Sequence, residues 1–317
     1  MSDRVTAAPL EHVYSASPGP IMPLDPQHGY RDFGQQSVSA QSAPHNGARP
    51  RWSAVPGPKG RADGFYLSET DLSHFSKHGW VVAVGVVPLP LCERLRGEMD
   101  ETFSHVTPWQ SDNGLQGLSE PHLRSAAFLD LFRVPGLVAA CRQLVGHRPR
   151  LRHCIALRTT IHPHTALHPD RLADPSTWDW HRDFAPDSII RHPGTSGTHL
   201  TSQAVVVAAY LTTSGAELGA TAFLDGTHLR PGTYAELAPT AIVVQPSVSA
   251  GSILFFSEAL MHAATPVTAA RTRDVVLTWM TAPWFGGEAP APFDIDRCNE
   301  PELKSVFAAP HFGDAGP

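Results

Sequence analysis

Two apolar runs, QAVVVAAYL at residues 203–211 and DVVLTWMT at residues 274–281, specify the architecture of this chain. Both are rich in β-branched and aromatic residues, and both are short for helices. Runs of the same kind recur after residue 150, separated by Gly, Pro and Thr: RHCIALRTTI (152–161), ATAFLD (220–225), AIVVQ (241–245) and GSILFF (251–256). Strands of this length and spacing predict a β-sandwich or jelly roll.

The region before residue 150 instead predicts helices. The segment SETDLSHFSKHG (68–79) has Ser68 as N-cap and Gly79 as helix stop, and a strand WVVAVGVV (80–87) follows. Three more helices are expected, from LCERLRGEMDETF (91–103), from a segment between Ser119 and Pro135, and from GLVAACRQLVG (136–146). Helices followed by strands predict an α+β fold, in which N-terminal helices pack against a double-stranded β-helix (jelly-roll, cupin-like) core.

The N-terminal segment differs from the rest of the chain. Residues 1–63 contain nine prolines with many Ser, Gly and Gln, and they show no sustained apolar period. Such a composition predicts a loop-like or partly disordered extension. We expect residues 64–317 to form a single jelly-roll domain.

Composition excludes several classes of protein. The hydrophobic content of 42% is enough for a packed core, and 24 Lys and Arg against 30 Asp and Glu give a net charge of −6, so no nucleic-acid-binding face is expected. The four cysteines form no CxxC pair, which favours a reducing, cytoplasmic location. No apolar run approaches the ~20 residues that span a bilayer, so no membrane association is expected. The oligomeric state is left open.

One short motif carries metal chemistry. The chain lacks a phosphate-binding GxxxxGK[ST] loop, HExxH and GxSxG, but it contains His181-Arg182-Asp183 and, after the strand GSILFF, His262. Alternate residues of an extended strand point to the same side, so His181 and Asp183 can face one metal ion, and His262 can join them from another strand. Two imidazoles and one carboxylate are the facial triad of non-haem iron(II) oxygenases.

A second HxD motif competes with the first. His168-Pro169-Asp170 has the same spacing, and the chain has 18 histidines in all. A proline between the two ligands suits a loop better than a strand inside a sheet. We therefore favour His181 and Asp183 over His168 and Asp170.

Four segments together resemble the phytanoyl-CoA dioxygenase (PhyH) family of iron(II)- and 2-oxoglutarate-dependent oxygenases. They are DLSHFSKHGWVVAVGVV (71–87), WDWHRD (178–183), GATAFLDGTH (219–228) and GSILFFSEALMHAATPVTAARTRDVVLTW (251–279), and the resemblance extends from Asp71 to Trp284. The third segment departs from the family pattern, with Leu218 in place of the usual Asn and Asp225-Gly226-Thr227-His228 in place of Pro-Gly-Ser-His.

The resemblance implies roles for individual residues. His181, Asp183 and His262 match the iron ligands, and Arg273, eleven residues after the last histidine, matches the arginine that binds the distal carboxylate of 2-oxoglutarate. Arg271 is the alternative candidate for this role. Alternate residues of a strand point to the same face, so the strand pattern does not separate Arg271 from Arg273. Thr221 matches a position whose hydroxyl contacts the co-substrate. The alternative is that Thr221 is an ordinary strand residue with no such role.

The resemblance also implies a reaction that consumes O2 and 2-oxoglutarate and yields succinate and CO2. Because Asp183 keeps the carboxylate that related halogenases lack, we expect hydroxylation, desaturation or cyclisation at an unactivated C–H. The expected substrate is a small natural-product intermediate or amino-acid derivative, with Phe184 as a candidate for lining its pocket. The alternative hypothesis is a non-catalytic jelly-roll protein that binds a metal or ligand, which would have no use for Arg273.

Overall fold

The computed structural model describes residues 65–111, 114–186, 189–191, 200–284 and 300–307, so the extension predicted at residues 1–63 lies outside the described residues. The helices are α1 (Glu69–His78), α2 (Leu89–His105), α3 (Pro121–Arg124), α4 (Ala127–Phe132), α5 (Leu137–Val145), α6 (Pro169–Ala173), α7 (Tyr234–Leu237) and α8 (Pro301–Phe307). None of these described helices combines the length and hydrophobicity needed to cross a bilayer.

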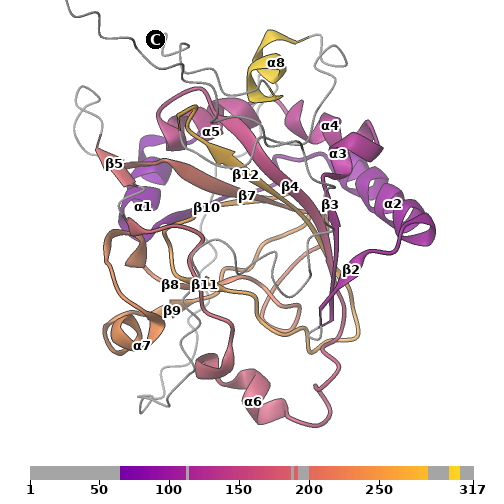
Figure 1. Ribbon diagram of the computed structural model, residues 1–317, viewed down its shortest axis with the longest axis vertical. Helices are drawn as coiled ribbons and strands as arrows, with labels where there is room; N and C mark the ends of the chain where they lie inside the picture. The colour runs from indigo at the N-terminus through magenta and orange to yellow at the C-terminus, as the bar shows by residue number, and fades with distance from the viewer. Residues whose placement is uncertain (1–64, 112–113, 187–188, 192–199, 285–299, 308–317) are drawn as a thin grey trace, which may run out of the picture.

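The described strands form two sheets that face each other and a separate two-stranded sheet. They are β1 (Trp80–Ala83), β2 (Trp109–Gln110), β3 (Leu115–Ser119), β4 (Arg150–Thr159), β5 (Ile189–Arg191), β6 (Leu200–Ser202), β7 (Ala204–Tyr210), β8 (Ala222–Leu224), β9 (Val243–Val244), β10 (Ile253–Ser257), β11 (His262–Ala263) and β12 (Arg273–Thr281). The larger sheet has the order β1-β10-β7-β12-β4-β3-β2 and the smaller one β11-β8-β9, while β5 and β6 form a separate pair. This antiparallel arrangement with helices confirms the predicted α+β jelly roll (Figure 1).

Alternating residues give the larger sheet two different buried faces. On β7, Val205 and Val207 belong to a cluster that includes Leu95 of α2 and Phe128 of α4. Val206, Ala208 and Tyr210 belong to a second cluster, which includes Phe223 of the smaller sheet. One face is therefore covered by helices, and the other encloses the interior of the jelly roll. Figure 1 shows α2, α3, α4 and α5 on the helix side of the larger sheet.

Helix α1 begins and ends where the sequence predicts. The side chain of Ser68 accepts a hydrogen bond from the backbone N–H of Asp71, and Gly79 ends the helix at φ 83°. A Cβ at Gly79 would lie 2.7 Å from Nδ1 of His228, so glycine is required both for the conformation and for the space. Nε2 of His228 lies 3.2 Å from the carbonyl oxygen of Ser76, and because a carbonyl only accepts, Nε2 carries the hydrogen and donates it. This histidine therefore anchors the end of α1.

Two details of the predicted pattern are wrong. The strand expected over residues 80–87 ends at Ala83, because Gly85 adopts φ 65° and turns the chain. The single helix expected between Ser119 and Pro135 is two short helices, α3 and α4, interrupted at Ser125, whose backbone is extended. The sequence interpretation also missed the hairpin of β2 and β3, which adds two strands to the edge of the larger sheet.

Candidate metal centre

Two histidines meet through a backbone bridge at the edge of the smaller sheet. The N–H of each residue donates to the carbonyl of the other, His181 to His262 and His262 to His181, both at 2.9 Å. Nε2 of His181 lies 3.9 Å from Oδ1 of Asp183, and Nε2 of His262 lies 4.0 Å from Oδ2 of the same carboxylate. Metal–ligand bonds of about 2 Å place two ligand atoms up to about 4 Å apart, so one ion can reach all three side chains. Within the described part of the chain, this is the one group with such spacing.

The hydrogen bonds of both imidazoles favour metal binding. Nδ1 of His181 lies 2.8 Å from the carbonyl oxygen of Asp179, and Nδ1 of His262 lies 2.9 Å from that of Leu260. A carbonyl oxygen only accepts, so each Nδ1 carries the hydrogen and each Nε2 presents its lone pair. Burial, followed by the neighbouring His181, lowers the pKa of His262 to about 4, which keeps its ring neutral at neutral pH.

Asp183 is held by contacts to distant segments rather than by a strand. The sequence predicts that His181 and Asp183 share one face of an extended strand, but only His181 forms a bridge, and Asp183 lies in the following bend. The backbone N–H of Asp183 donates to the carbonyl of Glu258 at 3.0 Å. Its Oδ2 accepts from the indole N–H of Trp279 at 3.2 Å. These two contacts determine where the carboxylate points.

The competing motif does not form a similar cluster. His168 and Asp170 are exposed, and Asp170 lies in the short helix α6. The nearby His164 is also exposed, and its ring centroid lies 6.2 Å from that of His168. Among the described residues, no third ligating side chain gathers with His168 and Asp170.

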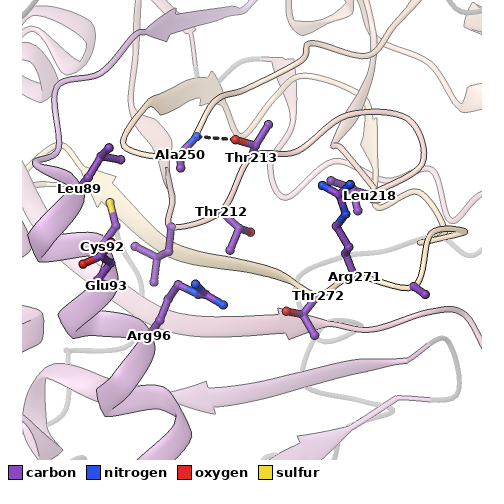
Figure 2. A pocket seen from close by; sticks show the side chains of 12 residues that line it. Leu89, Cys92, Glu93, Arg96, Thr212, Thr213, Leu218, Ala250, Arg271 and Thr272 are labelled. Carbon is purple, nitrogen blue, oxygen red and sulfur yellow. Dashed lines mark hydrogen bonds between the residues drawn. The ribbon is translucent and has the colours of Figure 1, made fainter.

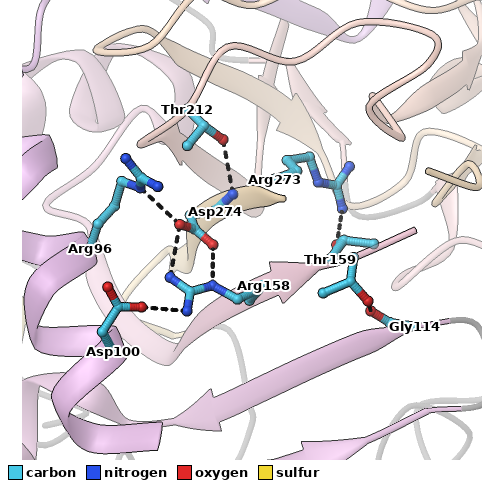
Figure 3. Close-up of polar contacts among 9 residues, drawn as sticks. Arg96, Asp100, Gly114, Arg158, Thr159, Thr212, Arg273 and Asp274 are labelled. Atoms are coloured by element: carbon cyan, nitrogen blue, oxygen red, sulfur yellow. Dashed lines mark hydrogen bonds and ion pairs between the residues drawn. The ribbon is translucent and has the colours of Figure 1, made fainter. Parts of the chain in front are cut away.

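Arg273 lies inside the jelly roll and Arg271 outside it. Arg273 begins β12, is 4% exposed, and shares the inner face of that strand with Val275 and Trp279. Its guanidinium donates to the carbonyl of Gly219 and, at 3.1 Å, to Oγ1 of Thr159, as Figure 3 shows for the threonine. The expectation that both arginines would point to the same face is therefore wrong.

Arg271 precedes the strand, so the alternation of β12 does not apply to it. It is exposed and lines a groove of about 660 Å³ together with Glu93 and Arg96 of α2 (Figure 2). This groove lies on the helix side of the larger sheet, because Arg96 pairs there with Asp274.

Thr221 immediately precedes β8 and lies two residues after Gly219. Its hydroxyl is 3.2 Å from the hydroxyl of Tyr210, which belongs to the inner cluster. Gly219 adopts φ 67°, and a Cβ there would lie 2.7 Å from the carbonyl oxygen of Thr265. Glycine thus allows the turn that presents its own carbonyl to Arg273 and sets the position of Thr221.

Phe184 lies beside a buried ion pair that the sequence interpretation missed. The guanidinium of Arg152 is 4.6 Å from the centroid of the Phe184 ring, and it lies 3.3 Å from a carboxylate oxygen of Glu258. Burial, and then the charge of Asp183, raises the pKa of Glu258, while Arg152 opposes that shift. The available signal was Glu258 itself, a charged residue inside the apolar segment GSILFFSEALMH.

The donor set fits iron(II). Two neutral imidazoles and one carboxylate on one side of an ion are the donors of non-haem iron(II) oxygenases, and they leave further positions open. The side chains of His181, Asp183 and His262 are 11%, 13% and 8% exposed, so the centre is largely shielded but reachable.

Comparison with known proteins agrees with this chemistry. The family model described as phytanoyl-CoA dioxygenase (PhyH) matches residues 75–275. No curated protein matches the chain in a sequence search.

Several solved structures share the fold. HygX from Streptomyces hygroscopicus, with nickel, 2-oxoglutarate and hygromycin B bound, is 19% identical, with 69% of this chain and 89% of that chain covered and a TM-score of 0.54. The epimerase SnoN from nogalamycin biosynthesis, in complex with Fe3+, α-ketoglutarate and nogalamycin RO, is 17% identical (71% and 96% covered, TM-score 0.53). The non-haem α-ketoglutarate-dependent carbocyclase SnoK from nogalamycin biosynthesis is 16% identical (72% and 88% covered, TM-score 0.53).

At these identities the solved structures establish the fold, and the family model supplies the family. Because that model matches more than half of the chain, the protein belongs to the phytanoyl-CoA dioxygenase (PhyH) family of iron(II)- and 2-oxoglutarate-dependent oxygenases.

Proposed function

We propose that His181, Asp183 and His262 bind the iron(II) and that Arg273 binds the distal carboxylate of 2-oxoglutarate. The observation that carries this proposal is the buried position of Arg273, on the same inner face of β12 as Trp279, the partner of Asp183. A planar guanidinium forms two parallel charge-assisted hydrogen bonds with a carboxylate. Thr221, two residues after the Gly219 carbonyl that Arg273 contacts, would supply a further hydroxyl.

Iron(II) and 2-oxoglutarate, when bound, supply an oxygen-dependent oxidation that releases succinate and CO2. The residues of this chain bind the metal and exclude water. The Nε2 atoms of His181 and His262 hold the metal from one edge of the smaller sheet, and Asp183 adds the negative charge. Apolar side chains of the inner cluster, such as Leu157, Val275 and Phe256, exclude water from the space between the sheets.

The proposed reaction is hydroxylation of an unactivated C–H of a small molecule, or a desaturation or cyclisation that starts at such a bond. The carboxylate of Asp183 favours these outcomes over chlorination, which requires a vacant position for chloride. A natural-product intermediate or amino-acid derivative as substrate is supported by the small molecules in the similar structures, hygromycin B for HygX and nogalamycin RO for SnoN. The reactions named for SnoN and SnoK, epimerisation and carbocyclisation, show that this fold supports more than hydroxylation.

The competing function is a non-catalytic jelly-roll protein that binds a metal or ligand. Such a protein needs no buried cation between its sheets, whereas Arg273 is buried and lies beside two segments, Gly219 to Thr221 and Thr159, that line the same interior. Burying a guanidinium costs several kcal/mol unless a partner compensates. The planar guanidinium of Arg273 is suited to bind the carboxylate of 2-oxoglutarate through charge-assisted hydrogen bonds.

An anaerobic titration tests the proposal directly. Metal-free protein is given iron(II) and then 2-oxoglutarate, and the visible charge-transfer band of the iron–2-oxoglutarate chelate is recorded. The expected result is a band that saturates at one equivalent of iron and is lost in Asp183→Ala. Iron binding without any band on addition of 2-oxoglutarate would support the non-catalytic alternative.

A further inference from the structure

Trp279 connects the candidate metal centre to a polar group on the neighbouring strand. Its side chain is buried at 6% exposure on the inner face of β12. A buried indole N–H needs an acceptor, and the acceptor here is Oδ2 of Asp183 at 3.2 Å. The second oxygen of that carboxylate, Oδ1, lies 3.9 Å from Nε2 of His181. Oδ2, the oxygen that accepts from the indole, also lies 4.0 Å from Nε2 of His262, so both oxygens of Asp183 face the candidate metal centre.

The regular pairing of β12 with β4 places His153 against the indole of Trp279, and a β-bulge follows directly after this pair. Trp279 pairs with His153 of β4, but the next residue, Met280, pairs with Leu151, so Arg152 is an extra residue in the ladder. A bulge bends its strand and redirects the side chains around it. Here the ring of His153 lies against the indole of Trp279, with centroids 5.3 Å apart and an interplanar angle of 37°.

His153 is in turn held by Glu120. Nδ1 of His153 lies 2.5 Å from Oε1 of Glu120, and the backbone N–H of Glu120 donates to the carbonyl of Cys154 at 2.8 Å. Glu120 adopts φ 50° and ψ 52°, and it is the one non-glycine residue with positive φ in the described part of the chain. A left-handed conformation at such a residue costs on the order of 1–3 kcal/mol, so it is kept only where several surrounding contacts stabilise it.

We infer that Trp279 is a positioning residue for Asp183, and that His153 and Glu120 hold its indole in place. The N–H of Trp279 binds Oδ2 and limits rotation of the carboxylate, so that Asp183 would be held in position to bind the iron. This inference rests on the proposed function and deepens it. Without this hydrogen bond, the carboxylate would lose a contact that keeps it directed at the Nε2 atoms of His181 and His262.

The chain offers a matched control in Trp80. This residue is 2% exposed, belongs to the same inner cluster, and donates its indole N–H to Oδ1 of Asp225 at 3.0 Å. Asp225 is not one of the three grouped ligands. Trp279→Phe and Trp80→Phe therefore each remove one indole-to-carboxylate hydrogen bond, but only the first involves a metal ligand.

The experiment measures metal binding to full-length wild type and to both variants, without substrate. Co(II) is titrated anaerobically, and both the dissociation constant and the visible ligand-field spectrum are recorded; the iron(II)–2-oxoglutarate band is then measured. Removing an outer contact of a metal ligand typically costs 10- to 100-fold in affinity. We expect about a 10-fold loss of Co(II) affinity and an altered spectrum for Trp279→Phe, and wild-type values for Trp80→Phe.

Wild-type affinity and spectrum in Trp279→Phe would overturn the inference, and so would an equal loss in Trp80→Phe. If Trp279→Phe does not fold, replacing its indole by benzothiophene keeps the shape and removes only the N–H, and the same expectations apply. Failure of the proposed function is a separate result, because it would be seen as the absence of the 2-oxoglutarate band in wild type itself.

Discussion

Arg273 and Asp274 are consecutive residues of β12 whose side chains enter opposite sides of the larger sheet (Figure 3). Arg273 points into the jelly roll, where it contacts Thr159 and Gly219. Asp274 points to the helix side, where Arg158 binds both of its oxygens at 2.7 and 3.0 Å and Arg96 of α2 binds one at 2.9 Å. The alternation of a β-strand thus separates a candidate co-substrate contact from a structural ion pair by a single residue.

Replacement of Arg273 should weaken 2-oxoglutarate binding selectively. Hydrogen bonds to charged groups contribute about 1.5–3 kcal/mol, which corresponds to roughly 10- to 100-fold in the dissociation constant. We expect a loss of that size for Arg273→Ala in the anaerobic titration and wild-type binding for Arg271→Ala, the exposed neighbour. Equal losses in both variants would contradict the assignment of Arg273.

The two HxD motifs predict opposite results for alanine variants. Asp183→Ala removes the one carboxylate of the grouped ligands and should abolish succinate formation and the charge-transfer band. Asp170→Ala removes an exposed carboxylate in α6 and should leave both unchanged. The reverse pattern would move the metal centre to the competing motif.

The pair of Asp274 with Arg158 should be important for stability. Asp274 is fully buried, the Arg158 side chain is 15% exposed, and the pair raises the pKa of Arg158. Removing one partner of a buried pair costs about 3–5 kcal/mol, so Asp274→Asn should lower the free energy of unfolding in urea by about that amount. Asp100→Asn, which affects the 65% exposed partner of the same arginine, should cost less than about 1 kcal/mol. Similar losses for the two variants would contradict this account.

Stability should fall on acidification because of His228. Burial is the main cause that lowers its pKa from 6.5 to about 4, while its contact with Ser76 opposes the shift. Between these values the unfolded chain binds more protons than the folded chain, so this contribution is complete above pH 6.5 and is lost progressively towards pH 4. The shift corresponds to at most about 3 kcal/mol.

Urea denaturation of the metal-free protein at pH 7 and pH 5 measures this effect. His228→Gln should show a smaller difference between the two pH values than wild type, with the remainder supplied by His74 and His262, whose pKa values are also lowered to about 4. His105→Gln, an exposed histidine, should behave as wild type. An unchanged pH difference in His228→Gln would show that this histidine is not involved.

Local patterns were sufficient for much of the fold. The N-cap Ser68 and the stop Gly79 predicted α1, and the β-branched runs predicted β4, β7, β10 and β12, because capping and side-chain periodicity depend on residues close in the chain. The grouping of His181, Asp183 and His262 was also expected, since the motif and the family resemblance both depend on short segments. The break at Ser125 was missed because two short helices and one longer helix have the same apolar pattern.

Contacts between distant segments were decided only by the tertiary structure. Whether Arg271 or Arg273 enters the jelly roll depends on the residue at which β12 starts, and that is determined by its pairing with β4. The direction of Asp183 depends on Trp279, 96 residues later, and the neighbour of Trp279 is His153 because of the register in which β12 pairs with β4. Because a one-residue shift reverses the face of every following side chain, such contacts follow from strand register and packing, which no local pattern in the sequence specifies.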